Sequence, residues 1–584
     1  MFEKYFAFFG NAVDIDRRFD YLVKIYNHDR LFSFDAFART VEYCADQMRS
    51  LGLTQVELLP LCADGKSAYG GFHLQRAWDA RCGLLTDTSD GFLYADYERT
   101  PCSLMMYSAA TPKDGITAQV VEVEEPEKAD AELLRGKFLL TSREPGRVAR
   151  LAVDAGAVGI LSDYFPLFPG TRDSRDEMRG ISRWDGSTLG GVNRDGTGLI
   201  GFSLSPENAD RLRERIHERG SVTLHAYTDC TRYDGVKYTV SGLLPGTDPD
   251  AGELLIYGHL YEPGANDNAS GCAVSLEIAA CLTAAIKAGT LPRPKRSIRF
   301  AMGDECTGSA AFLESHPEIA ERTVFGVVGD MIGCDITERT KSELWHAPLG
   351  NASLADTLIS DIFAAYADKD PFPWSDMPFR SGSDNVIGEP SLGIPTVGYI
   401  ISPALRYHTS GDTPETIDRN VLRRSCILLG TFLLKLAEAL PSDLPYYQTL
   451  TARVSRNLEG ALAQEVRNIA ERSLARFLGG TFEPERVAYP EPAAYAASDS
   501  GIIPVRTTKG WFTLSGAPEL AETYRKAFPF TLDKPISWTD GNRSLWQIYT
   551  LTAAECGTEM SEPLWKQFAA FYKDLCRCGY VTLR

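Results

Sequence analysis

The chain lacks a long apolar run and an excess of basic residues. No stretch reads as the roughly 18 consecutive apolar residues of a membrane helix, and residues 1–20 lack the basic start and apolar core of a signal peptide. Asp and Glu number 78 against 60 Lys and Arg, giving a formal net charge of −18. Because nucleic acids and anionic membranes attract basic surfaces, we expect a cytoplasmic protein with no nucleic-acid or membrane partner.

Cysteine is present without a pattern. The chain has 13 cysteines, an odd number, and no C-x-x-C pair; the closest spacing is that of Cys576 and Cys578. Disulfide frameworks and structural zinc sites need cysteines at characteristic spacings. Both are therefore excluded as the organising principle, and a reducing compartment is favoured.

One stretch, residues 254–271, has the pattern of a site. Leu254 to Tyr257 reads as a buried strand, and His259 stands at its end. A Pro/Gly loop follows and contains Asp267, and a long apolar helix follows the loop. Open α/β folds place ligand sites at this edge of a sheet, so His259 and Asp267 are candidate ligands of one metal centre. The alternative is a polar turn with a chance histidine.

Other apolar strands downstream also end in metal-binding residue types. Two strands end in carboxylates, at Asp304-Glu305 and at Asp330, and His408 follows a third strand after a short loop. With His259 and Asp267 these residues supply two imidazoles and three carboxylates as donors, a mixture that suits zinc, with cobalt or manganese possible. Five donors exceed the need of one tetrahedral zinc and suit two ions about 3.5–4 Å apart that share a carboxylate.

The order of these motifs resembles a known family. The dizinc aminopeptidases, grouped with bacterial leucyl aminopeptidase and glutamate carboxypeptidase, carry H-x-D, G-A-N-D-[DN]-x-[ST]-G, E-E-x-G-x-x-G-S, an Asp before M-I-G, and a late H-[ST]-x-x-D. The matching stretches here are residues 259–261, 264–271, 304–309, 330–333 and 408–412. The resemblance covers roughly residues 230–440 and part of the N-terminus. It implies a three-layer αβα catalytic domain with a mostly parallel mixed sheet.

The resemblance also implies roles for the donors. Asp267 would bridge two zinc ions, His259 and Asp330 would hold one, and Glu305 and His408 would hold the other. A bridging water would be the nucleophile, because a metal lowers the pKa of bound water toward about 7.

Two positions depart from the family pattern. Tyr261 stands where the family has an Asp that orients the first imidazole. Asp304 stands where the family has a Glu as the general base. We predict that Asp304 is the base in spite of its shorter reach, with the alternative that it only supports the site and that another group, such as Glu262, moves the proton. Asp384, in a turn before a further strand, either lines the pocket or serves only the turn.

At about 100–200 residues per domain, 584 residues predict several domains. Residues 116–227 resemble a protease-associated domain inserted in the catalytic domain, expected to be β-rich. Residues 540–584 resemble a small winged helix of α+β type. Because the chain is acidic and this end is rich in aromatics, contact with protein is favoured over contact with DNA. The expected parts are 1–115 and 228–445 (catalytic), 116–227 (insert), 446–539 (helical and Pro-rich connection) and 540–584 (winged-helix-like).

Three functions fit the sequence. The first is a dinuclear zinc aminopeptidase acting on peptides, with a homo-oligomer as one expected form. The second is an amidohydrolase that cleaves a non-peptide amide on the same scaffold. The third is a catalytically weak peptide-binding protein. Retention of all five donors argues against the third, whereas Tyr261 and Asp304 keep it open.

Overall fold

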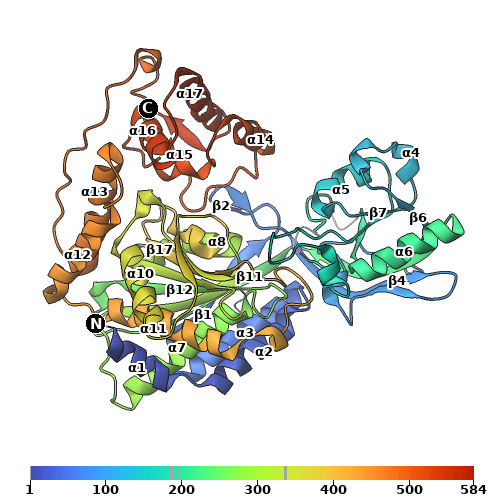
Figure 1. The fold of residues 1–584 in the computed structure, drawn as a ribbon, viewed down its shortest axis with the longest axis horizontal. Coiled ribbons are helices and arrows are strands. Elements are labelled where there is room, and N and C mark those ends of the chain that lie inside the picture. The colour runs from blue at the N-terminus through green and yellow to red at the C-terminus, as the bar shows by residue number, and fades with distance from the viewer. Residues whose placement is uncertain (1, 185–187, 194–197, 335–338) are drawn as a thin grey trace.

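The computed structural model describes residues 2–184, 188–193, 198–334 and 339–584. Figure 1 shows a large α/β body that holds the N-terminus, a second sheet-containing part to one side of it, and a helical C-terminal part above it.

The large body is built on an eight-stranded sheet in the order β1-β11-β13-β12-β14-β17-β15-β16. Its four central strands, β13, β12, β14 and β17, run parallel. β11 pairs antiparallel with β1 and β13, and β15 pairs antiparallel with β17 and parallel with β16. The strands are β1 Thr54–Ala63, β11 Gly235–Leu244, β12 Glu253–Leu260, β13 Ser297–Asp304, β14 Thr323–Asp330, β15 Lys341–Trp345, β16 Trp374–Met377 and β17 Thr396–Ser402.

Both faces of this sheet are buried. Along β12, Leu254 and Ile256 belong to the largest hydrophobic cluster, whereas Leu255 and Tyr257 belong to a smaller cluster with Phe312 of α8. Successive side chains of a strand point to opposite faces, so the alternation assigns one cluster to each face. The expected three-layer αβα fold with a mixed sheet is confirmed.

Most helices lie on the face of the large cluster, where α2 packs on α7 and α1 on α11 (Figure 1). Ser33 caps α3 by accepting a hydrogen bond from the Ala36 amide, as its position before the helix predicts. The helices on this face are α1 Glu3–Ala12, α2 Ile15–Asp29, α3 Phe34–Ser50, α7 Ala269–Lys287, α10 Leu354–Ala367 and α11 Arg419–Ala437. The other face is covered by α8 Thr307–Ser315 and α9 Pro317–Arg322.

Among the described residues, α7 is the only single helix that is long and apolar enough to cross a membrane. The helix α11 meets this length and hydropathy criterion only when it is taken together with the bent segment that follows it. Of the most apolar window of α7, 83% is buried inside the fold, as in the core helices of globular proteins.

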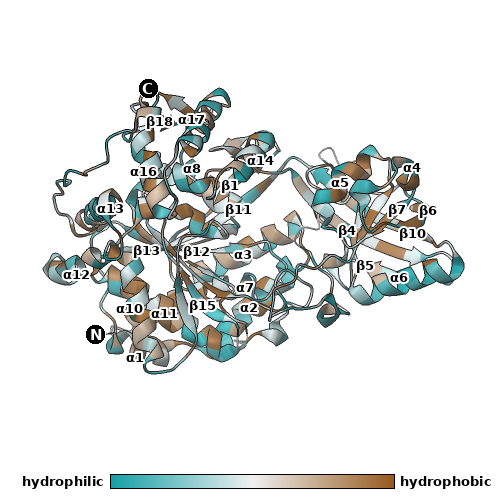
Figure 2. Ribbon diagram, turned by 45° about the horizontal axis from the view of Figure 1, so that its top comes forward, coloured by the Kyte–Doolittle hydropathy of each residue, from teal (hydrophilic) through white to brown (hydrophobic). Residues whose placement is uncertain are grey.

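The second part contains a seven-stranded sheet in the order β5-β4-β10-β6-β7-β8-β9. β4 and β5 lie before residue 116, so a unit drawn around this sheet would begin at Ala77 and include the long strand β10. The helix α6 beside it is mostly hydrophilic (Figure 2). The elements are β4 Ala77–Asp87, β5 Leu93–Asp96, β6 Ile116–Glu122, α4 Ala131–Leu134, β7 Phe138–Thr141, α5 Pro145–Asp154, β8 Gly159–Ser162, β9 Ile200–Ser203, α6 Pro206–Arg219 and β10 Thr223–Tyr233.

The C-terminal part has its own hydrophobic cluster. Leu564, Phe568 and Leu575, which the sequence places on one helical face, are all buried in it. Tyr524 and Phe528 also belong to this cluster, so the unit extends further back than residue 540. Its elements are β18 Pro504–Arg506, α14 Pro518–Ala527, α15 Asp533–Ser537, α16 Leu545–Glu555, α17 Glu562–Arg577 and β19 Val581–Leu583; α12 Leu444–Val454 and α13 Gly460–Leu478 precede them. β18 and β19 pair antiparallel, and the winged-helix assignment stays a prediction.

Candidate metal centre

The candidate ligands meet where the parallel strands end. β12 runs parallel to β13 and β14, and His259 lies opposite Gly303 in the register of β12 and β13. Because the carboxyl ends of parallel strands share one edge of the sheet, His259, Asp330 and Glu305 come together there. Asp267 reaches the same point from the loop between β12 and α7.

Asp267 lies between the two imidazoles. Its Oδ1 is 3.1 Å from His259 Nε2, and its Oδ2 is 3.1 Å from His408 Nε2. Asp330 Oδ1 lies 4.0 Å from His259 Nε2. For Glu305, one ligand atom lies within 4.8 Å of ligand atoms of both His259 and Asp330. The structure thus brings together all five donors that the sequence selects.

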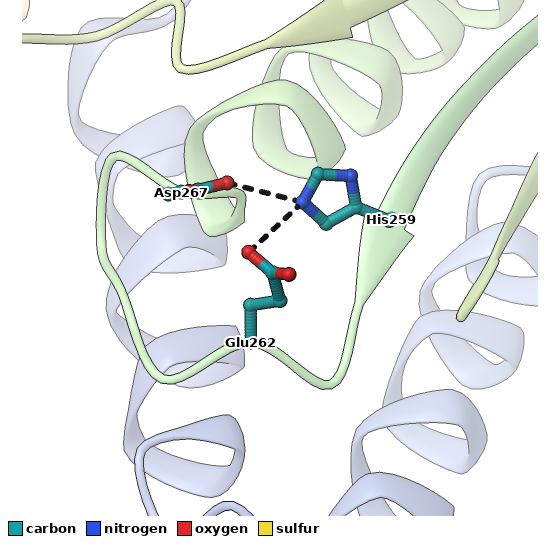
Figure 3. A group of neighbouring side chains, drawn as sticks. All are labelled: His259, Glu262 and Asp267. Atoms are coloured by element: carbon teal, nitrogen blue, oxygen red, sulfur yellow. Dashed lines mark hydrogen bonds and ion pairs between the residues drawn. The ribbon is translucent and has the colours of Figure 1, made fainter. Parts of the chain in front are cut away.

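Glu262 is a sixth potential donor. Its Oε2 is 3.4 Å from His259 Nε2, on the same imidazole nitrogen that faces Asp267 (Figure 3). In the sequence Glu262 is one acidic residue in a loop, named only as an alternative proton carrier. Its place three residues after His259 is the one signal that could have indicated a ligand.

Asp384 orients the first imidazole. Its Oδ2 lies 3.2 Å from His259 Nδ1, and its Oδ1 accepts a hydrogen bond of 2.8 Å from the Cys306 amide. A carboxylate in this position fixes the ring and leaves the other nitrogen for a metal. Asp384 is fully buried, so it supplies the contact that the family pattern would place at residue 261.

Tyr261 instead belongs to an aromatic cluster. Its ring lies 5.2–5.5 Å from the rings of Phe32, Phe34 and Phe37, and the Lys237 ammonium sits over it at 4.6 Å. The Tyr261 backbone amide donates a hydrogen bond of 2.9 Å to Asp29. The tyrosine therefore packs the wall beside the site and does not orient His259.

Asp412 holds the loop that carries Asp267. Its carboxylate accepts hydrogen bonds from the amides of Asn266 and Asp267 at 2.8 and 3.0 Å. A Cβ on Gly264 would lie 2.3 Å from Asp412 Oδ2, so only glycine fits there. These contacts fix the Asp267 backbone before any ligand is bound.

Asp304, the predicted base, is engaged on both oxygens. Its Oδ1 forms an ion pair of 2.7 Å with Lys237 Nζ, and its Oδ2 accepts a hydrogen bond of 2.7 Å from the Thr307 hydroxyl. The Lys237 side chain is only 8% exposed. Nothing in the sequence around Lys237 indicates this pairing. The catalytic role of Asp304 stays a prediction.

The candidate metal centre holds more carboxylates than imidazoles, and this excess of negative charge favours binding of a cation. Burial, together with the charge of Asp267, raises the pKa of Glu262 well above its usual value and that of Asp330 to about 7. Burial opposes ionisation of Asp267 as well, but hydrogen bonds from His259 and His408 lower its pKa far below the usual range. Three buried carboxylates, those of Asp267, Asp330 and Asp384, and two partly buried ones, those of Glu262 and Glu305, thus face two imidazoles.

Two oxygens of this cluster are also left without a hydrogen bond. In the described part of the chain, the buried atoms Asp330 Oδ1 and Glu262 Oε2 accept no hydrogen bond and face His259 Nε2 as ion pairs at 4.0 and 3.4 Å, respectively. Buried oxygens of this kind are costly unless paired or bound to a metal. The residues present therefore fit a metal ion.

Comparison with known families identifies this part of the chain. Residues 239–432 match peptidase family M28. The chain contains an M28 peptidase domain. The five sequence-selected donors, Glu262 and Asp384 all lie inside the M28 domain, whereas Lys237 lies two residues before the matched range.

Solved structures with a similar fold include two bacterial proteins. One is the zinc aminopeptidase BSAP of Bacillus subtilis, with a TM-score of 0.52 and 18% identity, covering 73% of this chain and 96% of that one. The other is an M28 peptidase precursor from Shewanella amazonensis SB2B, with a TM-score of 0.53 and 18% identity, covering 75% of this chain and 97% of that one. Comparison with curated protein sequences gave no match. The M28 domain of this chain therefore sits in a fold shared with these two proteins, with further residues outside the shared part.

Proposed function

We propose that the protein is a zinc-dependent aminopeptidase that hydrolyses the N-terminal peptide bond of peptides with two metal ions. The observation that carries the proposal is Asp267, whose two oxygens face His259 and His408 separately inside the M28 domain. The similar fold of BSAP, a zinc aminopeptidase, supports zinc as the metal.

The chain offers a ligand set for each ion. By the family resemblance, His259 and Asp330 would hold one ion, His408 and Glu305 would hold the other, and Asp267 would offer one oxygen to each. In the structure a ligand atom of Glu305 lies within 4.8 Å of ligand atoms of His259 and Asp330. When bound, zinc polarises the scissile carbonyl and lowers the pKa of water toward about 7. Asp384 would keep the His259 ring turned so that Nε2 faces the metal.

A carboxylate must take a proton from the attacking water and pass it to the leaving amine. Glu262 is favoured over Asp304 for this step because its Oε2 lies among the candidate ligands, where it forms an ion pair of 3.4 Å with His259 Nε2, the nitrogen that would face a metal. Asp304 is already held by Lys237 and Thr307. We therefore propose Glu262 for proton transfer in place of Asp304, the base predicted from the sequence, and we propose that Asp304 neutralises and positions Lys237.

A panel of substrates tests the proposed function. Purified protein loaded with zinc should release the first residue from aminoacyl-4-nitroanilides and from short peptides, and N-acetylated forms of the same peptides should resist. Cleavage confined to non-peptide amides would instead identify an amidohydrolase. Peptide binding by the zinc-loaded protein without turnover would identify a binding protein.

A further inference from the structure

A cavity of about 390 Å³ adjoins the candidate metal centre. Glu262 and Glu305 are among its lining residues. The lining also includes the charged residues Lys237 and Asp304, together with apolar side chains from parts of the chain that are distant in sequence: Phe32, Phe72, Met106, Tyr107 and Trp511. The last of these belongs to the C-terminal part, so that part reaches the cavity beside the candidate ligands.

Trp511 packs differently from its neighbours in the C-terminal part. Its neighbours in the chain, including Phe512, pack against the hydrophobic cluster of the C-terminal part. Trp511 packs against the large cluster of the catalytic body instead. There its ring meets Phe72 edge-on, with the ring centroids 5.8 Å apart. The side chain therefore crosses from one part of the protein into the other.

The loop that carries Trp511 is fastened on both sides. On the catalytic side, Arg506 pairs with Glu389, and the Gly510 amide donates a hydrogen bond of 2.8 Å to the Ser391 hydroxyl. On the C-terminal side, the Thr507 amide donates a hydrogen bond of 3.1 Å to the Tyr580 carbonyl. The position of the tryptophan is thus set before a ligand arrives.

A small hairpin, β2 Ala68–Tyr69 and β3 Phe72–His73, lies directly against this loop. A Cβ on Gly70 would lie 3.1 Å from the Lys509 carbonyl oxygen, and one on Gly71 would lie 3.6 Å from that of Thr513. Gly70 also has a φ of +57°, a conformation that favours glycine. Gly70 thus allows the hairpin to approach the loop closely, and Phe72 and Trp511 lie side by side in the wall of the cavity.

We propose that Trp511 is a specificity-determining residue, through which the C-terminal part closes the substrate pocket around an apolar side chain of the peptide's first residue. This inference rests on the proposed aminopeptidase function and deepens it. Ligand pockets span about 300–1,000 Å³, so a cavity of about 390 Å³ admits a small group and excludes a long peptide. The apolar part of the wall selects its side chain, and the carboxylates of Glu262 and Glu305 lie beside the bond to be cleaved.

The test compares three variants of the full-length protein. Trp511→Ala enlarges the pocket, and Thr513→Trp fills it, because Thr513 also lines the cavity. Phe512→Ala is the matched control, since the Phe512 ring meets Tyr580 edge-on, with the ring centroids 5.7 Å apart, and does not line the cavity. Each variant is assayed with leucyl, phenylalanyl and alanyl 4-nitroanilides. Binding of free L-leucine, L-phenylalanine and L-alanine is measured by calorimetry, a readout that does not depend on turnover.

Trp511→Ala should reduce the preference for leucyl and phenylalanyl over alanyl substrates by about tenfold or more in kcat/KM, the scale on which apolar pockets discriminate. It should weaken binding of L-leucine to a similar extent. Thr513→Trp should exclude L-phenylalanine while L-alanine still binds, and Phe512→Ala should behave as wild type.

Suppose that wild type cleaves the leucyl substrate, and that Trp511→Ala and Thr513→Trp both keep the wild-type substrate preference and amino-acid affinity. The proposed role of Trp511 is then wrong, while the aminopeptidase function stands. If zinc-loaded wild type cleaves none of the substrates, the proposed function fails and this inference falls with it.

Discussion

Substitution of Asp304 separates the two candidate proton carriers. Lys237 Nζ lies 2.7 Å from Asp304 Oδ1, and the lysine side chain is 8% exposed. Removing one partner of a buried ion pair costs about 3–5 kcal/mol of stability. The loss of stability in Asp304→Asn should lie near the lower end of this range, at about 3 kcal/mol. The Asn oxygen still accepts a hydrogen bond from Lys237, and the Tyr261 ring still faces the ammonium.

The same variant should retain most of its activity. The Glu262 carboxylate is untouched, so Asp304→Asn should keep its metal and lose little kcat once the protein is folded. Glu262→Gln should show the opposite pattern, with near-normal stability and kcat lower by about 10²–10⁴-fold, the usual contribution of a general base. Stability is measured by urea unfolding and kcat with a leucyl 4-nitroanilide, with metal content determined for each sample.

A double variant provides the control for the ion pair. Lys237→Met combined with Asp304→Asn removes the unpaired charge and should recover most of the lost stability. The reasoning is refuted if Asp304→Asn keeps full stability and metal but loses kcat by about 10²-fold or more, while Glu262→Gln remains active. In that case Asp304 would be the base.

Four further changes have definite expected outcomes. Asp267→Ala should lose metal and activity together, because it removes the oxygens that face both His259 and His408; normal metal content would contradict its bridging role. Asp384→Asn should weaken zinc affinity by about 10–100-fold with the fold intact, measured by competition with a chelator. Burial lowers the pKa of His346, but hydrogen bonds to Asp356 and Asp376 outweigh burial and raise it to about 10. The stabilisation from protonated His346 is therefore complete below about pH 6.5 and lost as pH rises through 10; urea unfolding at several pH values should show this loss in wild type and not in His346→Gln. Limited proteolysis should release the second sheet as one unit, with cuts near its two ends before any cut in the strands of the catalytic sheet.

Much of the catalytic sheet can be predicted from the sequence. Strands buried on both faces read as continuous apolar runs, and β12, β13 and β14 are each buried along their whole length. A polar residue at the end of such a run must lie at the edge of the sheet that is formed by the carboxyl ends of the parallel strands. This local rule is sufficient to select His259, Glu305 and Asp330 as neighbours.

The parts that could not be predicted depend on packing between distant segments. Asp384 reaches His259 across 125 positions of sequence, and its turn has no local feature that distinguishes a ring-orienting carboxylate from a structural one. Lys237 stands 67 positions before Asp304 in the sequence. The two residues meet only because β11 pairs with β13. β4 and β5 join the second sheet through β10, which lies far along the chain. The predicted boundary at residue 116 therefore marks a change in composition, whereas the sheet itself begins earlier, at Ala77.

The central claim is that Asp267 joins two zinc ions inside the M28 domain. The most direct measurement is metal content by elemental analysis of zinc-loaded protein after removal of free metal, made in parallel on wild type and Asp267→Ala. The account predicts about two zinc ions per wild-type chain and a marked loss of both in the variant. Clearly less than one tightly bound transition metal in wild type, with no gain of activity on adding zinc, would contradict it.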